Sequence, residues 1–171
     1  PARKQNLKNY SKVLQSLAAG CRFLQKNKCK FISIPCNTAH YWYEDLKKII
    51  EVPILNMPKI VYENASKNCS KGSKIGLLAT ETTINTGVYK RYFDKQYDLI
   101  SPQKKIQIEN VNRSIKLVKM GKTKEAEKAI KPAINYLLKK KCKKIILGCT
   151  ELPIAIFAYK SFKKAKISKI F

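Results

Sequence analysis

The residues best suited to chemistry in this sequence are two cysteines that occupy matching places in a repeated motif. Residues 28–40 read KCKFISIPCNTAH, and residues 141–153 read KCKKIILGCTELP. Each copy runs from Lys-Cys-Lys through an apolar stretch to Pro or Gly, and then to a second cysteine. Two copies so far apart are too few for a solenoid, which needs three or more units. The repeat therefore indicates two related halves, with Cys36 in one and Cys149 in the other.

Two thiols placed symmetrically could perform acid–base chemistry on opposite faces of one carbon. One thiolate would remove a proton from one face while the other thiol returns a proton to the opposite face, so that the configuration inverts. The two groups exchange roles in the reverse direction, which explains why the two sites are alike. A redox pair is the rival interpretation, and it requires the two Cα atoms to lie about 4.4–6.8 Å apart. The third interpretation is that both thiols only pack in the core.

The residues that follow the two cysteines are short and polar, and they favour the binding of a carboxylate. Backbone N–H groups at the helix starts predicted there could take part in the same binding. These N–H groups would also lower the pKa of each thiol from about 8.5 and favour the thiolate. The polar residues are Asn37, Thr38, Thr150 and Glu151.

The remaining cysteines and the single histidine do not indicate a metal centre. The chain has six cysteines without a CxxC pair, so no structural zinc site is expected. Cys29 and Cys142 begin apolar stretches and are expected to pack as small hydrophobic residues. Cys21 and Cys69 are expected to do the same or to lie at the surface. His40 is expected to form hydrogen bonds at a helix start rather than to act as a base.

The elements that must position the two thiols alternate between helix and strand. Helical spacing of apolar residues predicts helices over roughly 6–27, 41–50, 58–70, 86–95, 104–120, 122–140 and 152–160. Short apolar and β-branched runs predict strands over 30–35, 52–57, 74–80, 97–101, 143–147 and 167–171. This alternation is typical of parallel sheets covered by helices, whose ligands bind beyond the carboxyl ends of the strands. Cys36 and Cys149 each follow such a strand end.

The predicted fold class is α/β, with two similar parallel-sheet lobes related by pseudo-twofold symmetry and the active site between them. The segment NCSKGSK, residues 68–74, is the best candidate for a linker because it is small, polar and contains Gly. We therefore expect a first lobe of residues 1–70 plus 161–171, and a second lobe of residues 71–160.

The net charge of +25 does not by itself indicate a nucleic-acid-binding protein. Of the 36 basic residues four are Arg and the others are Lys, spread along the whole chain. Specific readers of nucleic acid depend on Arg for bidentate contacts, so no specific nucleic-acid partner is expected. No run of 18 apolar residues is present, so no membrane partner is expected. Because the first residues lack the apolar stretch of a signal peptide, we expect a cytoplasmic protein.

The segments PCNTAH and GCTELP resemble the two signature segments of the aspartate racemase family, within the cofactor-independent aspartate/glutamate racemases. Glutamate racemases typically have CNTAS or CNTAT at the first segment and GCTHYP at the second. This chain has His40 and Glu151 instead, which favours the aspartate branch. Other matches follow in family order, so that the resemblance covers nearly the whole chain: VPILNM at 52–57, GLLAT at 76–80, TGVY at 86–89 and Lys-x-Gly at 119–121.

The resemblance implies an amino-acid racemase that uses neither pyridoxal phosphate nor a metal and that acts on aspartate. A glutamate or broad-specificity racemase is the alternative. Cys36 and Cys149 would be the two acid/base residues. Thr83 matches a substrate-facing Thr, although Thr82 replaces the usual Gly before it. The residues implied to bind the substrate are Asn37, Thr38, Thr83, Thr150, Glu151, Lys119 and Arg3.

Two of these residues are implied to meet the substrate carboxylates. Lys119 matches a lysine of the family placed for that role. Arg3 resembles the Arg of a Pro-Asp-Arg turn in the family, with Ala2 in the place of the Asp.

The resemblance also implies segments that this sequence lacks. The family begins with a strand and a Gly-rich loop before the Arg turn, and it closes with a helix after the last strand. The chain thus looks truncated at both ends, and we expect the 171 residues alone to fold poorly or to be inactive. An inactive remnant of the family is accordingly a further alternative. Similar family members are commonly dimers, which implies a homodimer.

Overall fold

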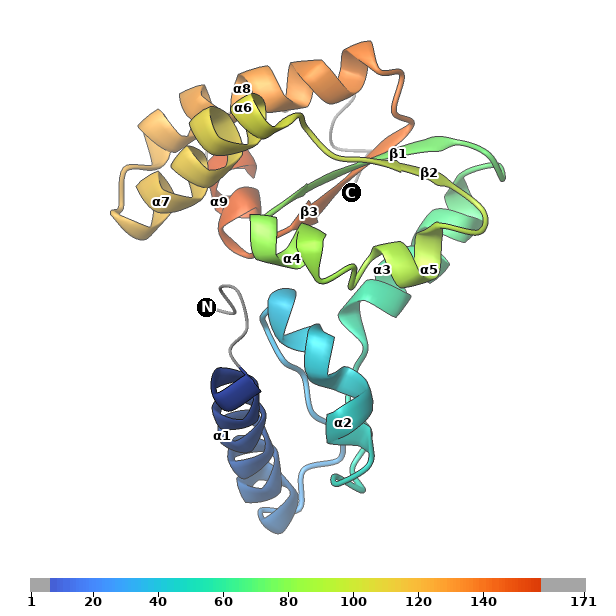
Figure 1. Ribbon diagram of the computed structural model, residues 1–171, viewed down its shortest axis with the longest axis vertical. Helices are drawn as coiled ribbons and strands as arrows, with labels where there is room; N and C mark the ends of the chain where they lie inside the picture. Colours follow the sequence, from blue (N-terminus) through green and yellow to red (C-terminus); the bar gives the residue numbers. More distant parts are fainter. Residues whose placement is uncertain (1–6, 158–171) are drawn as a thin grey trace.

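The computed structural model describes residues 7–157, and Figure 1 shows how their elements are arranged. A parallel sheet with helices on both faces forms the larger part of the molecule, and the first helices form a smaller part beside it. The elements in chain order are α1 (Leu7–Lys26), η1 (Thr38–Trp42), α2 (Tyr43–Lys47), α3 (Met57–Asn68), β1 (Lys74–Ala79), α4 (Glu81–Asn85), α5 (Lys90–Phe93), β2 (Asp98–Ile100), α6 (Lys104–Ile106), η2 (Gln107–Asn112), α7 (Arg113–Lys119), α8 (Thr123–Lys139), β3 (Lys144–Gly148) and α9 (Glu151–Phe157).

The sheet has the strand order β2-β1-β3, and both strand pairs are parallel. In the central strand β1, Ile75 lies opposite Leu99 of β2 and Lys144 of β3. Every residue of β1 after Lys74 is buried, as expected for a parallel strand that is covered on both faces. The expectation of an α/β fold with a parallel sheet is thereby confirmed.

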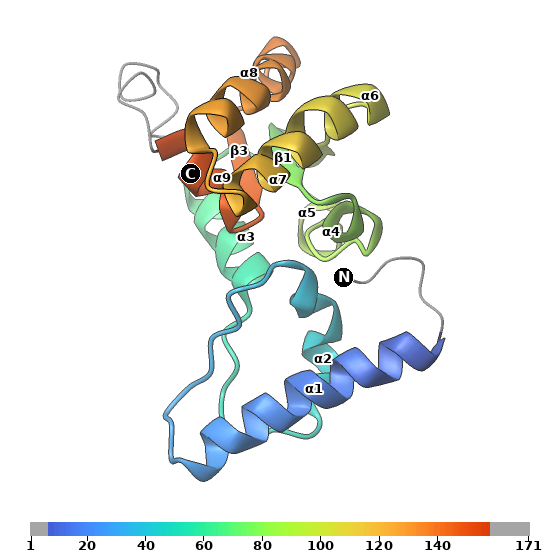
Figure 2. The same ribbon diagram turned by 90° about the vertical axis from the view of Figure 1, so that its left-hand side faces the viewer.

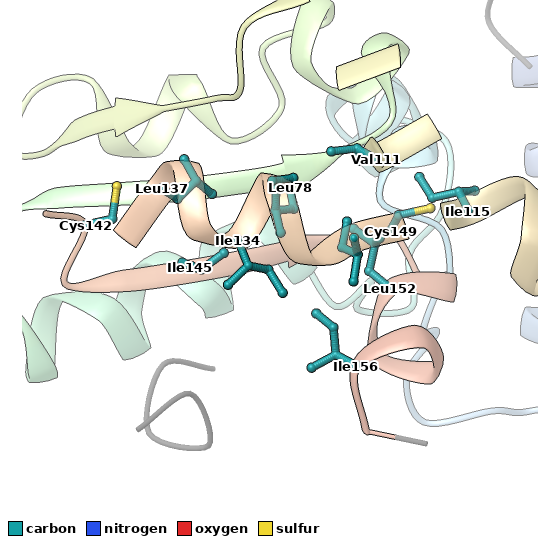
Figure 3. Close-up of a cluster of buried hydrophobic side chains, with 12 residues drawn as sticks. Leu78, Val111, Ile115, Ile134, Leu137, Cys142, Ile145, Cys149, Leu152 and Ile156 are labelled. Carbon is teal, nitrogen blue, oxygen red and sulfur yellow. The ribbon is translucent and has the colours of Figure 1, made fainter. Parts of the chain in front are cut away.

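The hydrophobic core lies on both faces of this sheet, because successive strand residues point to opposite sides. Leu78 of β1 and Ile145 of β3 belong to a cluster with α7, α8 and α9, which Figure 3 shows. Leu77 and Ile146 belong to the cluster on the other face, which includes residues of α3 and α5. The sheet is therefore held between two helical layers.

Helix α8 shows how the sequence pattern produces one of these layers. Ala126, Ile130, Ala133, Ile134 and Leu137 recur at spacings of three and four residues, and all five are buried. This spacing places them on one side of the helix, which packs on the sheet. None of the helices within residues 7–157 is long and apolar enough to cross a membrane.

The expected strands over 30–35 and 52–57 do not form as strands. The two segments meet in a single parallel bridge, in which Ile32 lies opposite Ile54. A two-stranded pair is marginal without a third neighbour, and Pro53 has no N–H to donate to a ladder. The strand predicted over 167–171 lies outside the described residues.

Two of the expected helices are divided into shorter pieces, and a third is shortened. The segment 41–50 contains the end of η1 and the whole of α2, and the segment 104–120 contains α6, the π-helical η2 and α7. The segment 86–95 retains only α5, because Gly87 adopts a positive φ of 66° between α4 and α5. Gly121, with φ of 74°, separates α7 from α8, as the sequence predicts.

The repeated motif forms the same local structure twice, at the ends of α1 and α8. Lys28 and Lys141 both adopt the left-handed conformation, with φ of 59° and 63°. In each copy the lysine N–H donates to the carbonyl three residues earlier, over 3.0 Å in the first copy and 2.8 Å in the second. The N–H of the cysteine that follows donates to the carbonyl five residues earlier, over 3.4 and 3.2 Å. Both helices therefore end in a Schellman motif.

Candidate active site

The two cysteine turns of the repeat face one cavity of about 340 Å³. Figure 2 shows η1, which follows the first turn, on the side of the smaller part that faces α4 and the sheet. Cys149 follows the carboxyl end of β3, where ligands bind in parallel sheets. The residues that line the cavity are Cys36, Asn37, Thr38, Thr80, Thr82, Lys119, Gly148, Cys149, Thr150 and Glu151.

The first turn presents an exposed thiol on a backbone held by a buried histidine. Cys36 is exposed, and its N–H donates to the carbonyl of Ile34 over 2.7 Å. His40 is 3% exposed, and its Nδ1 lies 2.9 Å from the carbonyl oxygen of Cys36. Its Nε2 lies 3.3 Å from the carbonyl oxygen of Leu55. Both ring nitrogens thus face backbone carbonyls, and His40 supports the turn as a hydrogen-bonding residue.

The second turn presents a buried thiol. Cys149 belongs to the hydrophobic cluster of Figure 3, where it lies near Ile115 and Leu152. Its Sγ–H donates a hydrogen bond to Glu151 Oε2 over 2.9 Å. Burial, together with this hydrogen bond, raises the pKa of the Cys149 thiol to about 12. The expectation that a helix start lowers the thiol pKa is therefore wrong for Cys149, because burial, and then the carboxylate of Glu151 at the start of α9, disfavour the thiolate.

Glu151 connects this thiol to a lysine from another element. Its Oε2 also accepts a hydrogen bond from Thr150 over 3.2 Å, and its Oε1 lies 3.6 Å from Nζ of Lys119 at the end of α7. Partial burial acts to raise the pKa of Glu151, but the hydrogen bond from Cys149 and the charge of Lys119 outweigh it, so that the pKa lies below its ordinary value. Glu151 is therefore ionised at neutral pH and paired with Lys119.

A chain of three threonine hydroxyls joins the two parts of the molecule behind the cavity. Oγ1 of Thr83 lies 2.7 Å from Oγ1 of Thr38 and 2.9 Å from Oγ1 of Thr80. Thr80 caps α4 by accepting a hydrogen bond from the N–H of Thr83 over 3.1 Å. Thr83 is only 1% exposed, so its hydroxyl supports Thr38 and Thr80, which line the cavity.

The structure brings most of the sequence-predicted site residues together around this cavity. Thr83 lies behind its wall, and Arg3 lies outside the described residues. Sequence reasoning missed Thr80, although its position directly after β1 is a usable signal, and it noticed Thr82 only as the replacement of a Gly. All six cysteines are free thiols. Among residues 7–157, no group of three or more His, Cys, Asp or Glu side chains could hold a metal ion.

Solved structures that share this fold include an aspartate racemase and a homologue of an aspartate racemase. Over 88% of this chain and 61% of the other, the fold matches the aspartate racemase of Picrophilus torridus with a TM-score of 0.74 and 26% identity. An aspartate racemase homologue from Pyrococcus horikoshii OT3 matches over 92% of this chain and 69% of the other, again with a TM-score of 0.74 and 26% identity. The fold and the paired cysteine turns thus define a racemase-like α/β protein.

Comparison with sequences identifies the family. Residues 1–168 match the model of the Asp/Glu/Hydantoin racemase family, and the chain belongs to this family. It is 26% identical to the broad specificity amino-acid racemase RacX of Bacillus subtilis, over 84% of this chain and 62% of the relative. It is 30% identical to a glutamate racemase of Carboxydothermus hydrogenoformans, over 77% of this chain and 48% of the relative. The chain thus spans about half to three fifths of the length of these relatives.

Proposed function

We propose that this chain is part of an amino-acid racemase that interconverts L- and D-aspartate, with Cys36 and Cys149 as its two acid/base residues. The observation that carries the proposal is that the matching turns of an internal repeat, far apart in sequence, line one cavity. A cavity with a thiol from each of two turns suits a reaction that needs one proton acceptor and one proton donor at the same carbon.

The two thiols differ in a way that sets the starting state of the reaction. Cys149 enters as the neutral thiol, because its pKa is raised to about 12. Cys36 is exposed, and as the thiolate it removes the proton from Cα of one enantiomer. The Cα–H electron pair remains on the substrate as a carbanion, and the thiol of Cys149 donates its proton to the opposite face. The enzyme is then left with a neutral Cys36 and a Cys149 thiolate, which is the state that begins the reverse reaction.

The polar residues of the cavity would bind the substrate and stabilise the carbanion. Asn37, Thr38 and Thr150 supply hydrogen-bonding groups at the two turns. Lys119, and Arg3 from outside the described residues, would neutralise the substrate carboxylates, which lowers the free energy of the carbanion. Lys119 pairs with Glu151 in the structure, so binding requires a shift of its exposed side chain. In this scheme neither pyridoxal phosphate nor a metal takes part.

Aspartate is the substrate that we propose, because the second signature segment carries Glu151 and a racemase named for aspartate shares 26% identity with the chain. Glutamate or a broader set of amino acids is the alternative, since relatives named for these substrates have similar identities. One methylene group changes the discrimination by only about 1–3 kcal/mol, so the choice needs a direct measurement.

The arrangement of the whole protein stays a prediction. It comprises two pseudo-symmetric lobes, one of residues 1–70 plus 161–171 and one of residues 71–160, and a cytoplasmic homodimer.

The experiment that tests the function follows hydrogen–deuterium exchange at Cα in deuterated water. L-Aspartate and L-glutamate are incubated separately with the chain, and NMR and chiral chromatography follow deuterium uptake and the D-isomer. Growth of deuterated D-aspartate alone would support the proposal, and growth of D-glutamate would identify the alternative. Absence of both would contradict racemase activity in this chain. Cys36→Ser and Cys149→Ser are expected to abolish the activity, while Cys69→Ser, outside the cavity lining, is the matched control.

A further inference from the structure

We propose that Tyr89 is a positioning residue that sets the distance between the Cys36 and Cys149 turns across the cavity. This inference rests on the proposed two-thiol function but concerns a residue outside the set that would touch the substrate. Tyr89 reaches both turns with one rigid side chain: its hydroxyl is bonded to the first turn, and its ring lies beside the second.

The backbone before α5 turns Tyr89 into the core. Gly87 has a φ of 66°, a conformation that glycine adopts without strain, and it reverses the chain after α4. Val88 and Tyr89, which follow, are each 1% exposed. The ring of Tyr89 packs against Phe93, with their centroids 6.4 Å apart, in the cluster beneath the sheet. The side chain is therefore almost fully buried, with Phe93 as a ring neighbour.

The hydroxyl of Tyr89 holds the first cysteine turn. It donates a hydrogen bond to Asn37 Oδ1 over 2.5 Å, and Asn37 is 5% exposed and directly follows Cys36. Burial and the nearby Cys149 thiol raise the pKa of Tyr89 above its ordinary value, so the hydroxyl stays protonated and remains a donor. A buried hydrogen bond of this kind fixes the orientation of Asn37, because a lost partner would leave a buried polar atom unsatisfied.

The ring of Tyr89 lies against the second cysteine turn. A Cβ atom added to Gly148 would lie 3.2 Å from Cε2 of Tyr89, so the ring lies beside the position immediately before Cys149 and leaves no room for a side chain there. The distance between the hydroxyl and this ring edge is fixed by covalent bonds. Tyr89 therefore acts as a spacer of constant length between the two turns. A misplacement of reacting groups by about 1 Å can lower a rate about 100-fold, so such a spacer would matter for inversion.

The chain offers a matched control in Tyr92, three residues further along. Its hydroxyl accepts a hydrogen bond from Asn56 Nδ2 over 2.8 Å, and Asn56 caps α3. This is a second Tyr–Asn hydrogen bond between distant segments, but neither residue lines the cavity. Tyr89→Phe and Tyr92→Phe thus delete the same group from similar bonds, and only the first bond reaches a cysteine turn.

The first measurement compares inversion with exchange. In deuterated water, the amount of D-isomer formed is divided by the deuterium incorporated into the recovered L-isomer. This ratio does not depend on the folded fraction, because unfolded protein lowers both quantities together. We expect Tyr89→Phe to lower the ratio about tenfold, since one thiol can still exchange the proton while the opposite thiol is misplaced. An unchanged ratio in Tyr89→Phe, or an equal fall in Tyr92→Phe, would overturn the proposal.

The second measurement needs no turnover, so it decides the proposal even if the chain is not a racemase. The short bis-electrophile 1,3-dichloroacetone can link Cys36 to Cys149 by forming two thioethers with release of two chlorides. Peptide mass mapping then measures the yield of this bridge as a fraction of the alkylated Cys36. We expect this yield to fall at least about twofold in Tyr89→Phe and in Asn37→Ala, and no further in the double variant, because both changes break one bond. Yields equal to those of wild type and Tyr92→Phe would refute the spacer role.

Discussion

The thiol of Cys149 and the carboxylate of Glu151 form a hydrogen bond of 2.9 Å at the start of α9. The bond makes the two cysteine turns chemically unequal although their sequences repeat. Cys149 is buried with its proton held on sulfur, whereas Cys36 is exposed to the cavity. A two-thiol reaction requires such a difference at its start, because one group must be a base while the other is an acid.

Alkylation should distinguish the two thiols before any substrate is added. We expect iodoacetamide at pH 8 to modify Cys36 at least about tenfold faster than Cys149, because the thiolate is the reactive form and the pKa of Cys149 is about 12. Peptide mass mapping over time measures both rates in one sample. Equal rates would show that the pKa of Cys149 is not raised in solution.

Two substitutions beside Cys149 should move its pKa in opposite directions. Glu151→Gln removes the carboxylate that accepts the thiol proton, so the pKa should fall. Lys119→Met removes a positive charge that favours the thiolate, so the pKa should rise. The pH dependence of alkylation of Cys149 measures both shifts, in a Cys36→Ser background that leaves one thiol in the cavity. Shifts in the same direction would contradict the pairing of Lys119 with Glu151.

The raised pKa of Cys149 should make the fold less stable in alkali. Between the ordinary thiol pKa of about 8.5 and the folded value of about 12, the unfolded chain has lost the thiol proton while the folded chain retains it. The folded state then binds more protons, so the free energy of unfolding falls as pH rises through this window. Urea unfolding at pH 8, 9 and 10 measures the slope. Cys149→Ser should show a shallower slope, since its hydroxyl does not titrate there.

Gly148 should be intolerant of a side chain, because three neighbours crowd the position. An added Cβ would lie 2.9 Å from Cβ of Ala79 and 3.0 Å from Cδ1 of Leu77, besides its contact with Tyr89. Overpacking of this kind costs about 1–3 kcal/mol, so Gly148→Ala should lower the free energy of unfolding by that amount. Thermal or urea unfolding measures the change.

Gly20 is the matched control for this substitution. It lies exposed within α1, and an added Cβ would have nothing within 4 Å. Gly20→Ala should raise the free energy of unfolding by up to about 1 kcal/mol, because Ala is the better helix former. A loss of stability at Gly20 equal to that at Gly148 would show that crowding is not the cause.

The sequence predicted the strands of the sheet well, because parallel strands that are buried on both faces consist of continuous runs of apolar residues. KIGLLA became β1 and KIILG became β3. It failed over 30–35 and 52–57, where the same kind of run forms one bridge. A pair of strands is marginal without a third neighbour, and no local pattern says whether such a neighbour is present.

The candidate site was predictable as far as it lies in the repeat, and unpredictable where it depends on contacts between distant segments. The repeat located both thiols and their polar neighbours. The pKa of Cys149 depends on the burial of α9 and on the orientation of Glu151. No local sequence pattern indicates either of them. Tyr89 belongs to the TGVY match, but its contact with the first cysteine turn was unpredictable for the same reason, since its partner Asn37 lies 52 residues away.

The left-handed lysines at the ends of α1 and α8 allow the same substitution to be compared in the two parts of the molecule. The comparison tests whether the two parts unfold cooperatively. Lys28 and Lys141 are both exposed and have nearly the same φ, so replacement of either by Gly relieves a similar strain of about 1 kcal/mol. If the molecule unfolds as one body, the two substitutions raise the free energy of unfolding equally. If the smaller part opens first, Lys28→Gly stabilises only that early transition, and the difference between the two variants measures how tightly the parts are joined.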